Sequence, residues 1–388
     1  MKIKLGHLVL AEGEATGHAH RASSGSLYNI GGGLMLLGSP VIFAVGAACV
    51  SAMLAAIIAG FEVGPRVGLC LNGNRMLVKG WHTPGIFGPF PAAAAAGRVL
   101  GLDPARMHHA FGIAGPQDAG IMAAQFGSMV KRMLSAKAAQ SGLYSALLAA
   151  DGFTGIENVF EEGYGGYCTT FTQTAGDFDL SALSAELGER WETMRISIKR
   201  HACVGTNLST LDAIEELVQE GLRAGDVDRV TVRMTEDAVK HSYWTPYVPA
   251  GLTAAQMHIG FCIGMKLIEG EVFVDQMTDA NLVRPDVLAL IDRVAVERDP
   301  EREKKGRPFA RGADVAVVLK NGTILKKTVD NFLGSWQRPM SDAQMAAKYR
   351  RLAAKALAPA DVSALERTVR DLESATDVAG LVALLGAR

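Results

Sequence analysis

The residues best suited to chemistry are histidine and lysine side chains that lie among glycine and other small residues, in three clusters. The first cluster is Gly80-Trp81-His82-Thr83-Pro84-Gly85. A histidine in a loop just before a helix N-terminus is well placed to meet an anion, because free N–H groups and the helix dipole favour negative charge there. The alternative interpretation is a surface loop anchored by Trp81.

The second cluster gathers cationic side chains among small residues. It holds Lys131 and Arg132, and it continues to Lys137 and Gln140. Guanidinium and ammonium groups in such surroundings can bind carboxylates. A solvated helix start is the alternative.

The third cluster is the run Lys199-Arg200-His201, followed by Ala202 and Cys203. Residues 194–199 alternate apolar and polar side chains, which predicts a half-buried strand. A helix is expected next, capped by Thr206, Asn207 or Ser209. A lysine and a histidine at a strand end that faces a helix N-terminus could form an anion-and-base site.

Metal and cofactor motifs are absent from the sequence. The five cysteines, at positions 49, 70, 168, 203 and 262, are isolated and odd in number, which predicts small buried thiols in the cytoplasm rather than disulfides or a metal cluster. His18 and His20 form a lone His-x-His pair without further ligands nearby. The glycine patches do not join a strand to a helix, so a dinucleotide site is not expected. Since no metal or cofactor motif is present, any catalysis is expected to come from side-chain acids and bases.

Composition narrows the class of protein further. Of 388 residues, 49% are hydrophobic and 20% charged, which suits a globular chain with a large core. The net charge of −1 argues against a nucleic-acid partner. Residues 41–61 are apolar and long enough to span a bilayer, but they are rich in alanine and glycine and no second span follows. A buried core helix is therefore predicted, and a membrane anchor at 41–61 is the minority alternative.

The order of elements predicts a mostly helical protein with a smaller α+β part. Residues 41–190 have helical patterns, and Asp103-Pro104 marks a helix start. Strands are expected at 194–199, 230–234 and 294–297, a hairpin around Asn321-Gly322, and helices near 208–218 and 254–269. We predict an atypical segment 1–40, a helical domain 41–192 plus 335–388 whose last helices return to it, and an α+β lid 193–334.

In order and spacing, these clusters resemble the MmgE/PrpD family. The resemblance is carried by residues 59–64, 80–88, 92–102, 114–115, 131–132, 137–142, 199–203 and 338–342. It implies a helical domain plus an α+β lid, usually in a homodimer, with the active site in the cleft between them. Family members act on small di- or tricarboxylates without an iron–sulfur cluster, by removing a proton next to a carboxylate or carbonyl group.

The resemblance also suggests roles for the three clusters. By matching position, His82 would be the catalytic acid or base, and Lys131 and Lys199 would clamp carboxylates. A buried lysine with a lowered pKa is the alternative base. Substrate-binding side chains are expected nearby, namely those of Arg132, Lys137, Gln140, Arg200 and His201.

The sequence also departs from the family pattern. Family members usually carry a longer N-terminal helical part with an Asp-Asp…His loop, and residues 1–40 do not resemble it. Leu134 stands where the family often has histidine, and Phe261 where some members have tyrosine. The leading hypothesis is a cofactor-free hydro-lyase, similar to 2-methylcitrate dehydratase. The alternatives are an epimerase or decarboxylase on the same scaffold, a catalytically silent carboxylate-binding relative, and a chain whose residues 1–40 come from a rearranged reading frame.

Overall fold

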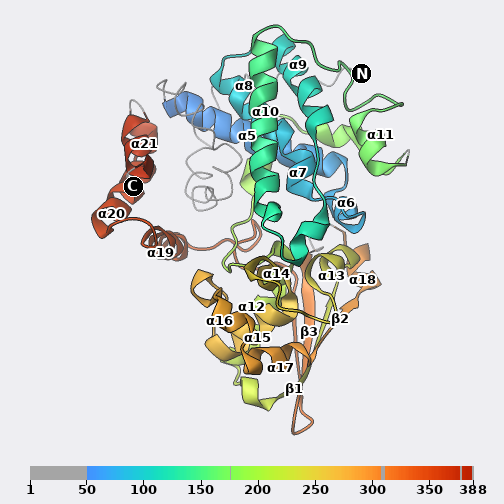
Figure 1. The fold of residues 1–388 in the computed structure, drawn as a ribbon, viewed down its shortest axis with the longest axis vertical. Coiled ribbons are helices and arrows are strands. Elements are labelled where there is room, and N and C mark those ends of the chain that lie inside the picture. The colour runs from blue at the N-terminus through green and yellow to red at the C-terminus, as the bar shows by residue number, and fades with distance from the viewer. Residues whose placement is uncertain (1–49, 175, 307–310, 376–377, 387–388) are drawn as a thin grey trace. The chain divides into compact units, whose positions relative to one another are not determined.

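The computed structural model describes residues 50–386 except 175, 307–310 and 376–377 (Figure 1). The predicted segment 1–40, the His18/His20 pair, Cys49 and the start of the predicted helix 41–61 lie outside the described residues. The chain divides into two compact units. Unit 1 comprises the described residues up to Ile121, together with Arg132–Ile196 and Ser341–Arg388, and unit 2 comprises Met122–Lys131 and Ser197–Met340. The predicted fold class is confirmed, since helices dominate and one small mixed sheet is present.

Unit 1 is helical throughout its described part. Its helices are α5 (Val50–Cys70), α6 (Gly73–Val78), α7 (Thr83–Phe87), α8 (Pro89–Val99), α9 (Pro104–Ala114), most of α10 (Val130–Ala150), α11 (Tyr167–Thr172), α19 (Asp342–Ala353), α20 (Pro359–Arg370) and α21 (Ala379–Gly386). The alanine run of α8 is fully buried and lets α5 approach closely. The predicted cap of α9 is present, because the Asp103 carboxylate accepts the Arg106 N–H at 2.8 Å.

Helix α5 is long and apolar enough to cross a membrane, a property that core helices of soluble proteins share. In this structure it carries a buried ion pair between Glu62 and Arg66. The Arg66 guanidinium donates to the carbonyl oxygen of Ala185 at 2.8 Å, and Glu62 accepts the Thr193 N–H at 2.7 Å. These contacts are those of a helix packed inside unit 1.

The C-terminal helices share a small core with the start of α5. Val50 and Leu54 of α5 pack with Leu365 of α20 and Leu381 of α21. The capping box at Ser341 and Gln344 fixes the start of α19.

Unit 2 contains a four-stranded sheet in the order β2-β1-β3-β4. The strands are β1 (Val227–Met234), β2 (Val294–Arg298), β3 (Ala313–Leu319) and β4 (Ile324–Val329). Strand β2 runs parallel to β1, and β3 is antiparallel to both β1 and β4. The predicted strands near 230 and 294 and the hairpin around Asn321-Gly322 are therefore confirmed.

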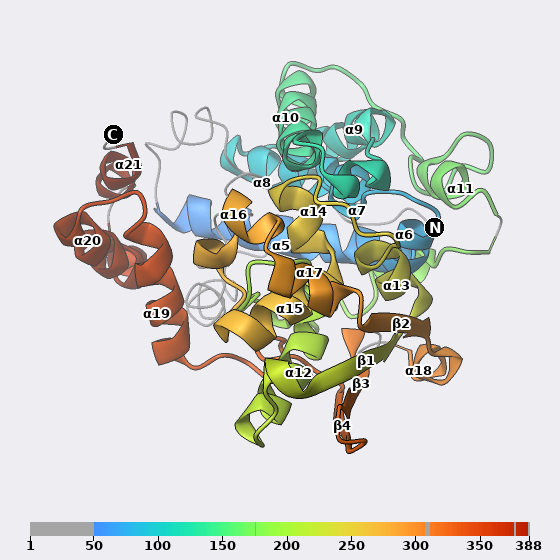
Figure 2. The same cartoon turned by 60° about the horizontal axis from the view of Figure 1, so that its bottom comes forward.

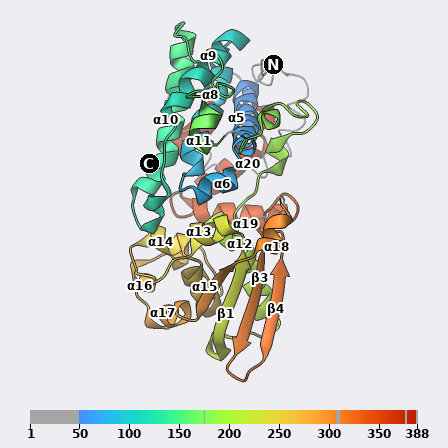
Figure 3. The same cartoon turned by 90° about the vertical axis from the view of Figure 1, so that its right-hand side faces the viewer.

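One face of this sheet is covered by helices (Figure 3). The helices of unit 2 are α12 (Leu208–Gln219), α13 (Glu236–Ser242), α14 (Leu252–Met257), α15 (Ile259–Glu269), α16 (Asp279–Leu282), α17 (Pro285–Ile291) and α18 (Pro300–Lys304). Ile214 and Leu217 of α12 and Ile263 of α15 pack on Val230 and Val317 of the sheet. Figure 2 shows α12, α15 and α17 close to β1.

Two predicted elements differ from the structure. The strand predicted at 194–199 is absent: Glu192–Arg195 forms a single 3₁₀ turn, and the Ile198 N–H donates to the Gly334 carbonyl oxygen at 2.7 Å without a ladder on either side. The helix predicted at 254–269 is interrupted at His258, which ends α14 and caps α15. In the first place a tertiary contact replaces the expected ladder, and in the second the His258 side chain caps α15 by accepting the Phe261 N–H.

Candidate active site

His82 lies at the junction between α6 and α7 in unit 1. It occupies the N-cap position of α7, just before Pro84 in the first turn, and it is only 6% exposed. Its backbone N–H donates to the Gly120 carbonyl oxygen at 3.0 Å. A Cβ on Gly85 would clash with the Ala119 carbonyl oxygen, so glycine is required there. The predicted catalytic histidine is thus held against residues 119–120.

This neighbouring loop contributes a buried acid, Asp118, that no sequence motif indicated. Both carboxyl oxygens of Asp118 are buried and make no hydrogen bond within the described part of the chain. Burial raises the pKa of Asp118 well above its usual range. The Tyr167 hydroxyl, which donates to the Ile86 carbonyl oxygen, has a pKa raised by burial and by the nearby Asp118. The signal in the sequence was an acidic residue inside an apolar, glycine-rich stretch.

In unit 2, buried polar side chains gather at the start of α12. The 3₁₀ turn Gly205–Asn207 leads directly into this helix. Four side-chain oxygens here are buried and accept or donate no hydrogen bond within the described residues, those of Thr206, Asn207, Ser209 and Thr210. Because buried polar groups are almost always paired, such a group at a helix N-terminus is suited to a polar or anionic ligand.

Two cationic side chains reach the same turn. A Cβ built on Gly205 would lie 2.9 Å from Nη1 of Arg311 and 4.0 Å from Cε of Lys199. Lys199, a predicted carboxylate clamp, therefore lies beside the start of α12. Arg311 was not singled out from the sequence, since it is far from the other clusters along the chain and only the fold brings it here.

Two buried cysteines, Cys203 and Cys262, lie next to this turn. The Asn207 amide nitrogen lies 3.5 Å from the Cys262 sulfur and 3.3 Å from the Met257 carbonyl oxygen. A hydrogen bond with Cys262 and burial raise the pKa of Cys203, although Lys199 opposes this shift. The described cysteines are all free and buried, as predicted. Among the described residues, no group of three or more metal-ligating side chains is present.

Lys131 belongs to unit 2, whereas the adjoining Arg132 begins the next stretch of unit 1. The segment Met122–Lys131 is held in unit 2 by Phe126, whose ring centroid is 5.0 Å from that of Trp244, and by Gln125, whose amide donates to the Lys240 carbonyl oxygen at 3.3 Å. These contacts attach residues 125 and 126, a few positions before Lys131, to residues 240 and 244.

The other residues predicted on α10 are exposed. The Lys137 ammonium group donates to the Gln140 side chain at 2.9 Å, one turn further along the helix. Arg132 is exposed as well. Their substrate-binding role stays a prediction.

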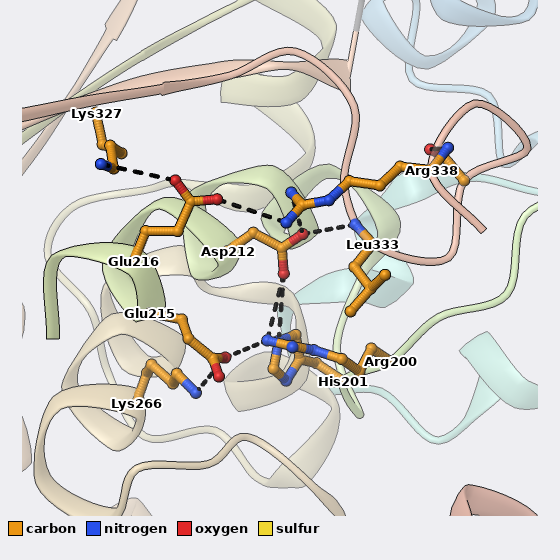
Figure 4. A network of polar contacts seen from close by, with 10 residues as sticks. Arg200, His201, Asp212, Glu215, Glu216, Lys266, Lys327, Leu333 and Arg338 are labelled. Atoms are coloured by element: carbon orange, nitrogen blue, oxygen red, sulfur yellow. Dashed lines mark hydrogen bonds and ion pairs between the residues drawn. The ribbon is translucent and has the colours of Figure 1, made fainter. Parts of the chain in front are cut away.

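Arg200 and His201 enter a charge network on α12 (Figure 4). Asp212 is buried and accepts the Leu333 N–H at 2.6 Å, and the Arg200 guanidinium lies 3.4 Å from it. Arg200 also pairs with Glu215, to which the Lys266 ammonium group donates at 2.7 Å. Burial raises the pKa of Asp212, against the effect of the Leu333 N–H and of Arg200 and Arg338.

His201 is neutral inside this network. Burial, together with the charges of Arg200 and Lys266, lowers its pKa to about 3. The contacts of Arg200 and His201 thus anchor α12, and their predicted role in substrate binding remains untested.

Comparison with protein families identifies the class to which this fold and these clusters belong. The MmgE/PrpD N-terminal domain matches residues 39–179 and the MmgE/PrpD C-terminal domain matches residues 201–374. The chain belongs to the MmgE/PrpD family, as the sequence motifs predicted.

The chain is similar to several proteins that are named cis-aconitate decarboxylase or cis-aconitate decarboxylase-like. The chain is 36% identical over 342 residues to a cis-aconitate decarboxylase-like protein, oryM, of Aspergillus oryzae, covering 86% of this chain and 70% of that protein. It is 33% identical over 348 residues to a cis-aconitate decarboxylase of Aspergillus terreus, covering 87% and 70%. A human cis-aconitate decarboxylase is 25% identical over 351 residues, covering 86% and 68%.

Proposed function

We propose that this protein is a carboxy-lyase that removes carbon dioxide from a small tricarboxylate of the cis-aconitate type. The observation that carries the proposal is that Lys199 and Arg311 lie beside the start of α12. Several buried side-chain oxygens at this helix start have no hydrogen-bond partner among the described residues. Two cations and a helix N-terminus suit a ligand with several carboxylate groups. The names of the fungal relatives support decarboxylation as the reaction.

The proposed reaction shifts one double bond and requires one proton. In cis-aconitate, the bond between the methylene carbon and its carboxyl group breaks, and its electron pair forms a new double bond between the methylene carbon and the central carbon. The electrons of the original double bond move to the CH carbon, where the attached carboxylate delocalises the negative charge. This CH carbon then takes up a proton. The enzyme must therefore stabilise the extra negative charge and deliver the proton.

His82 is the side chain we assign to proton delivery. It is buried at the N-cap of α7, where its backbone N–H donates to the Gly120 carbonyl oxygen. A general acid must be positioned in this way to deliver a proton. Lys199 and Lys131 are assigned to the substrate carboxylates, as the resemblance predicted, and Arg311 is added to them. Fixed cations stabilise developing negative charge without reorganising during the reaction.

The test is to incubate the purified protein with cis-aconitate, citrate, 2-methylcitrate and iminodisuccinate in heavy water and to follow each by proton NMR. Loss of the cis-aconitate vinyl signal together with a new deuterated methylene group and carbon dioxide supports the proposal. Elimination of water from citrate or 2-methylcitrate would instead establish the hydro-lyase predicted from sequence. No change in any substrate with folded protein would favour the silent carboxylate-binding relative.

A further inference from the structure

We propose that the Tyr247 hydroxyl group donates a hydrogen bond to a carboxylate of the substrate held at the start of α12. This inference rests on the proposed function and adds a residue that binds substrate.

The Tyr247 hydroxyl is a buried donor that has no acceptor among the residues the structure describes. Its oxygen is inaccessible and makes no hydrogen bond within the described part of the chain. The ring is fixed by its neighbours, since its centroid lies 4.6 Å from that of His258 and 6.3 Å from that of Phe261. Packing of the ring thus holds the hydroxyl in place.

Tyr243, a neighbouring tyrosine, has a hydrogen-bonded hydroxyl and therefore serves as a comparison. Its ring also packs on His258, with centroids 5.7 Å apart. Its hydroxyl, however, donates to the Val294 carbonyl oxygen at 3.1 Å. Two tyrosines therefore flank one histidine, and only Tyr243 uses its hydroxyl to hold the fold together.

Contacts within unit 2 connect Tyr247 to the start of α12. Cys262 directly follows Phe261, and its sulfur lies 3.5 Å from the Asn207 amide nitrogen. Tyr247 also packs against the buried cluster that contains Cys262 and Leu208, the first residue of α12. Asn207 is fully buried, and its own side-chain oxygen is among the unpaired atoms at this turn. Tyr247 and Asn207 therefore contact the same buried cluster, and among the described residues both retain unused hydrogen-bonding capacity.

The chemistry of the phenol indicates its role. Burial, and to a smaller extent Cys262, raises the pKa of Tyr247 to about 12. The hydroxyl stays protonated in neutral solution, so it acts as a hydrogen-bond donor rather than as a base. Lys199 and Arg311 beside Gly205 make a carboxylate the acceptor that this part of unit 2 favours.

The matched variants Tyr247→Phe and Tyr243→Phe test the inference. We expect Tyr247→Phe to weaken binding of cis-aconitate and of the unreactive analogue propane-1,2,3-tricarboxylate by about 10- to 100-fold, the usual effect of losing a hydrogen bond to a charged group. Its Tm without ligand should be unchanged or higher, because no protein hydrogen bond is lost. Tyr243→Phe should lower the Tm and leave both affinities unchanged.

Calorimetry and ligand-induced Tm shifts give readouts that do not require turnover. If wild-type protein binds the analogue but releases no carbon dioxide, the decarboxylase proposal fails, and weaker binding by Tyr247→Phe still supports the role of Tyr247. If Tyr247→Phe binds both ligands as tightly as wild type, the inference is overturned while the decarboxylase proposal stands. If wild-type protein binds neither ligand, both proposals are overturned.

Discussion

Gly205 and Arg311 fit together so closely that any side chain at position 205 would displace the guanidinium group. A Cβ on Gly205 would lie 2.9 Å from Nη1 of Arg311. Because Gly205 opens the 3₁₀ turn that leads into α12, its missing side chain is what allows a cation to approach this helix start. A substitution at Gly205 therefore tests whether Arg311 binds substrate.

Gly205→Ala should raise KM for cis-aconitate about 10-fold, since the methyl group pushes the guanidinium away from one ion pair or hydrogen bond with substrate. The Tm should hardly change, because the clashing atom is the end of a flexible side chain. Steady-state kinetics and a thermal melt measure both quantities. Gly225→Ala is the matched control, as a Cβ there meets no atom within 4 Å. An unchanged KM would remove Arg311 from the site.

Lys199→Ala should lower kcat/KM about 100-fold, the effect of removing a charge-assisted contact made to substrate in the transition state. Lys199 is exposed, so the folded state should survive the substitution. Lys320→Ala removes another exposed ammonium group, from the turn between β3 and β4, and should leave kcat/KM unchanged. Equal activity of the two variants would contradict the assigned role of Lys199.

His82→Gln should reduce kcat by about two to four orders of magnitude, the range expected when a general acid is removed. Binding of propane-1,2,3-tricarboxylate should change far less than kcat. His108→Gln serves as the control, because His108 is an exposed histidine of the same unit. The account of proton delivery fails if His82→Gln turns over at the wild-type rate.

Asp212→Asn should destabilise the protein by about 3 kcal/mol, because it removes a buried carboxylate that accepts the Leu333 N–H and faces Arg200. Urea unfolding measures the loss. Glu216→Gln, on the same helix, disrupts more exposed pairs with Arg338 and Lys327 and should cost less than about 1 kcal/mol. Equal stabilities of the two variants would show that the network does not anchor α12.

Stability should decline below about pH 6.5 because two histidines are buried in the neutral form. Their folded-state pKa values, about 3 for His201 and about 4 for His258, lie below the ordinary 6.5. The unfolded chain therefore binds more protons, and each histidine reduces the unfolding free energy by up to about 1.4 kcal/mol per pH unit as the pH falls toward its folded-state value.

His258→Asn isolates one of these contributions. Asparagine can still accept the Phe261 N–H that His258 Nδ1 now accepts at 3.3 Å, but it does not titrate. Between pH 6.5 and 4, urea unfolding should show a shallower decline for His258→Asn than for wild type. Parallel declines would contradict the assignment of a neutral His258.

The sequence correctly predicted the structural elements that depend only on neighbouring residues. The hairpin at Asn321-Gly322 and the cap at Asp103 depend on neighbouring residues only, and both are present. The strand expected at 194–199 is absent because alternation of side chains does not supply a partner strand.

The candidate site was predictable only in part. Lys199 and His82 stand in recognisable motifs, whereas Asp118, Tyr247 and Arg311 do not. Asp118 and Tyr247 are notable because their polar atoms are buried without a partner among the described residues, and Arg311 because it reaches Gly205. Both properties arise from tertiary packing, which no local pattern encodes.

The most direct test of the decarboxylase proposal is carbon dioxide release from cis-aconitate in heavy water, measured together with the proton NMR spectrum of the product. The account predicts one carbon dioxide and one deuterium incorporated per substrate consumed, with both rates reduced about 100-fold in Lys199→Ala. Consumption of cis-aconitate by addition of water without carbon dioxide, or no reaction by folded protein that binds propane-1,2,3-tricarboxylate, would contradict it.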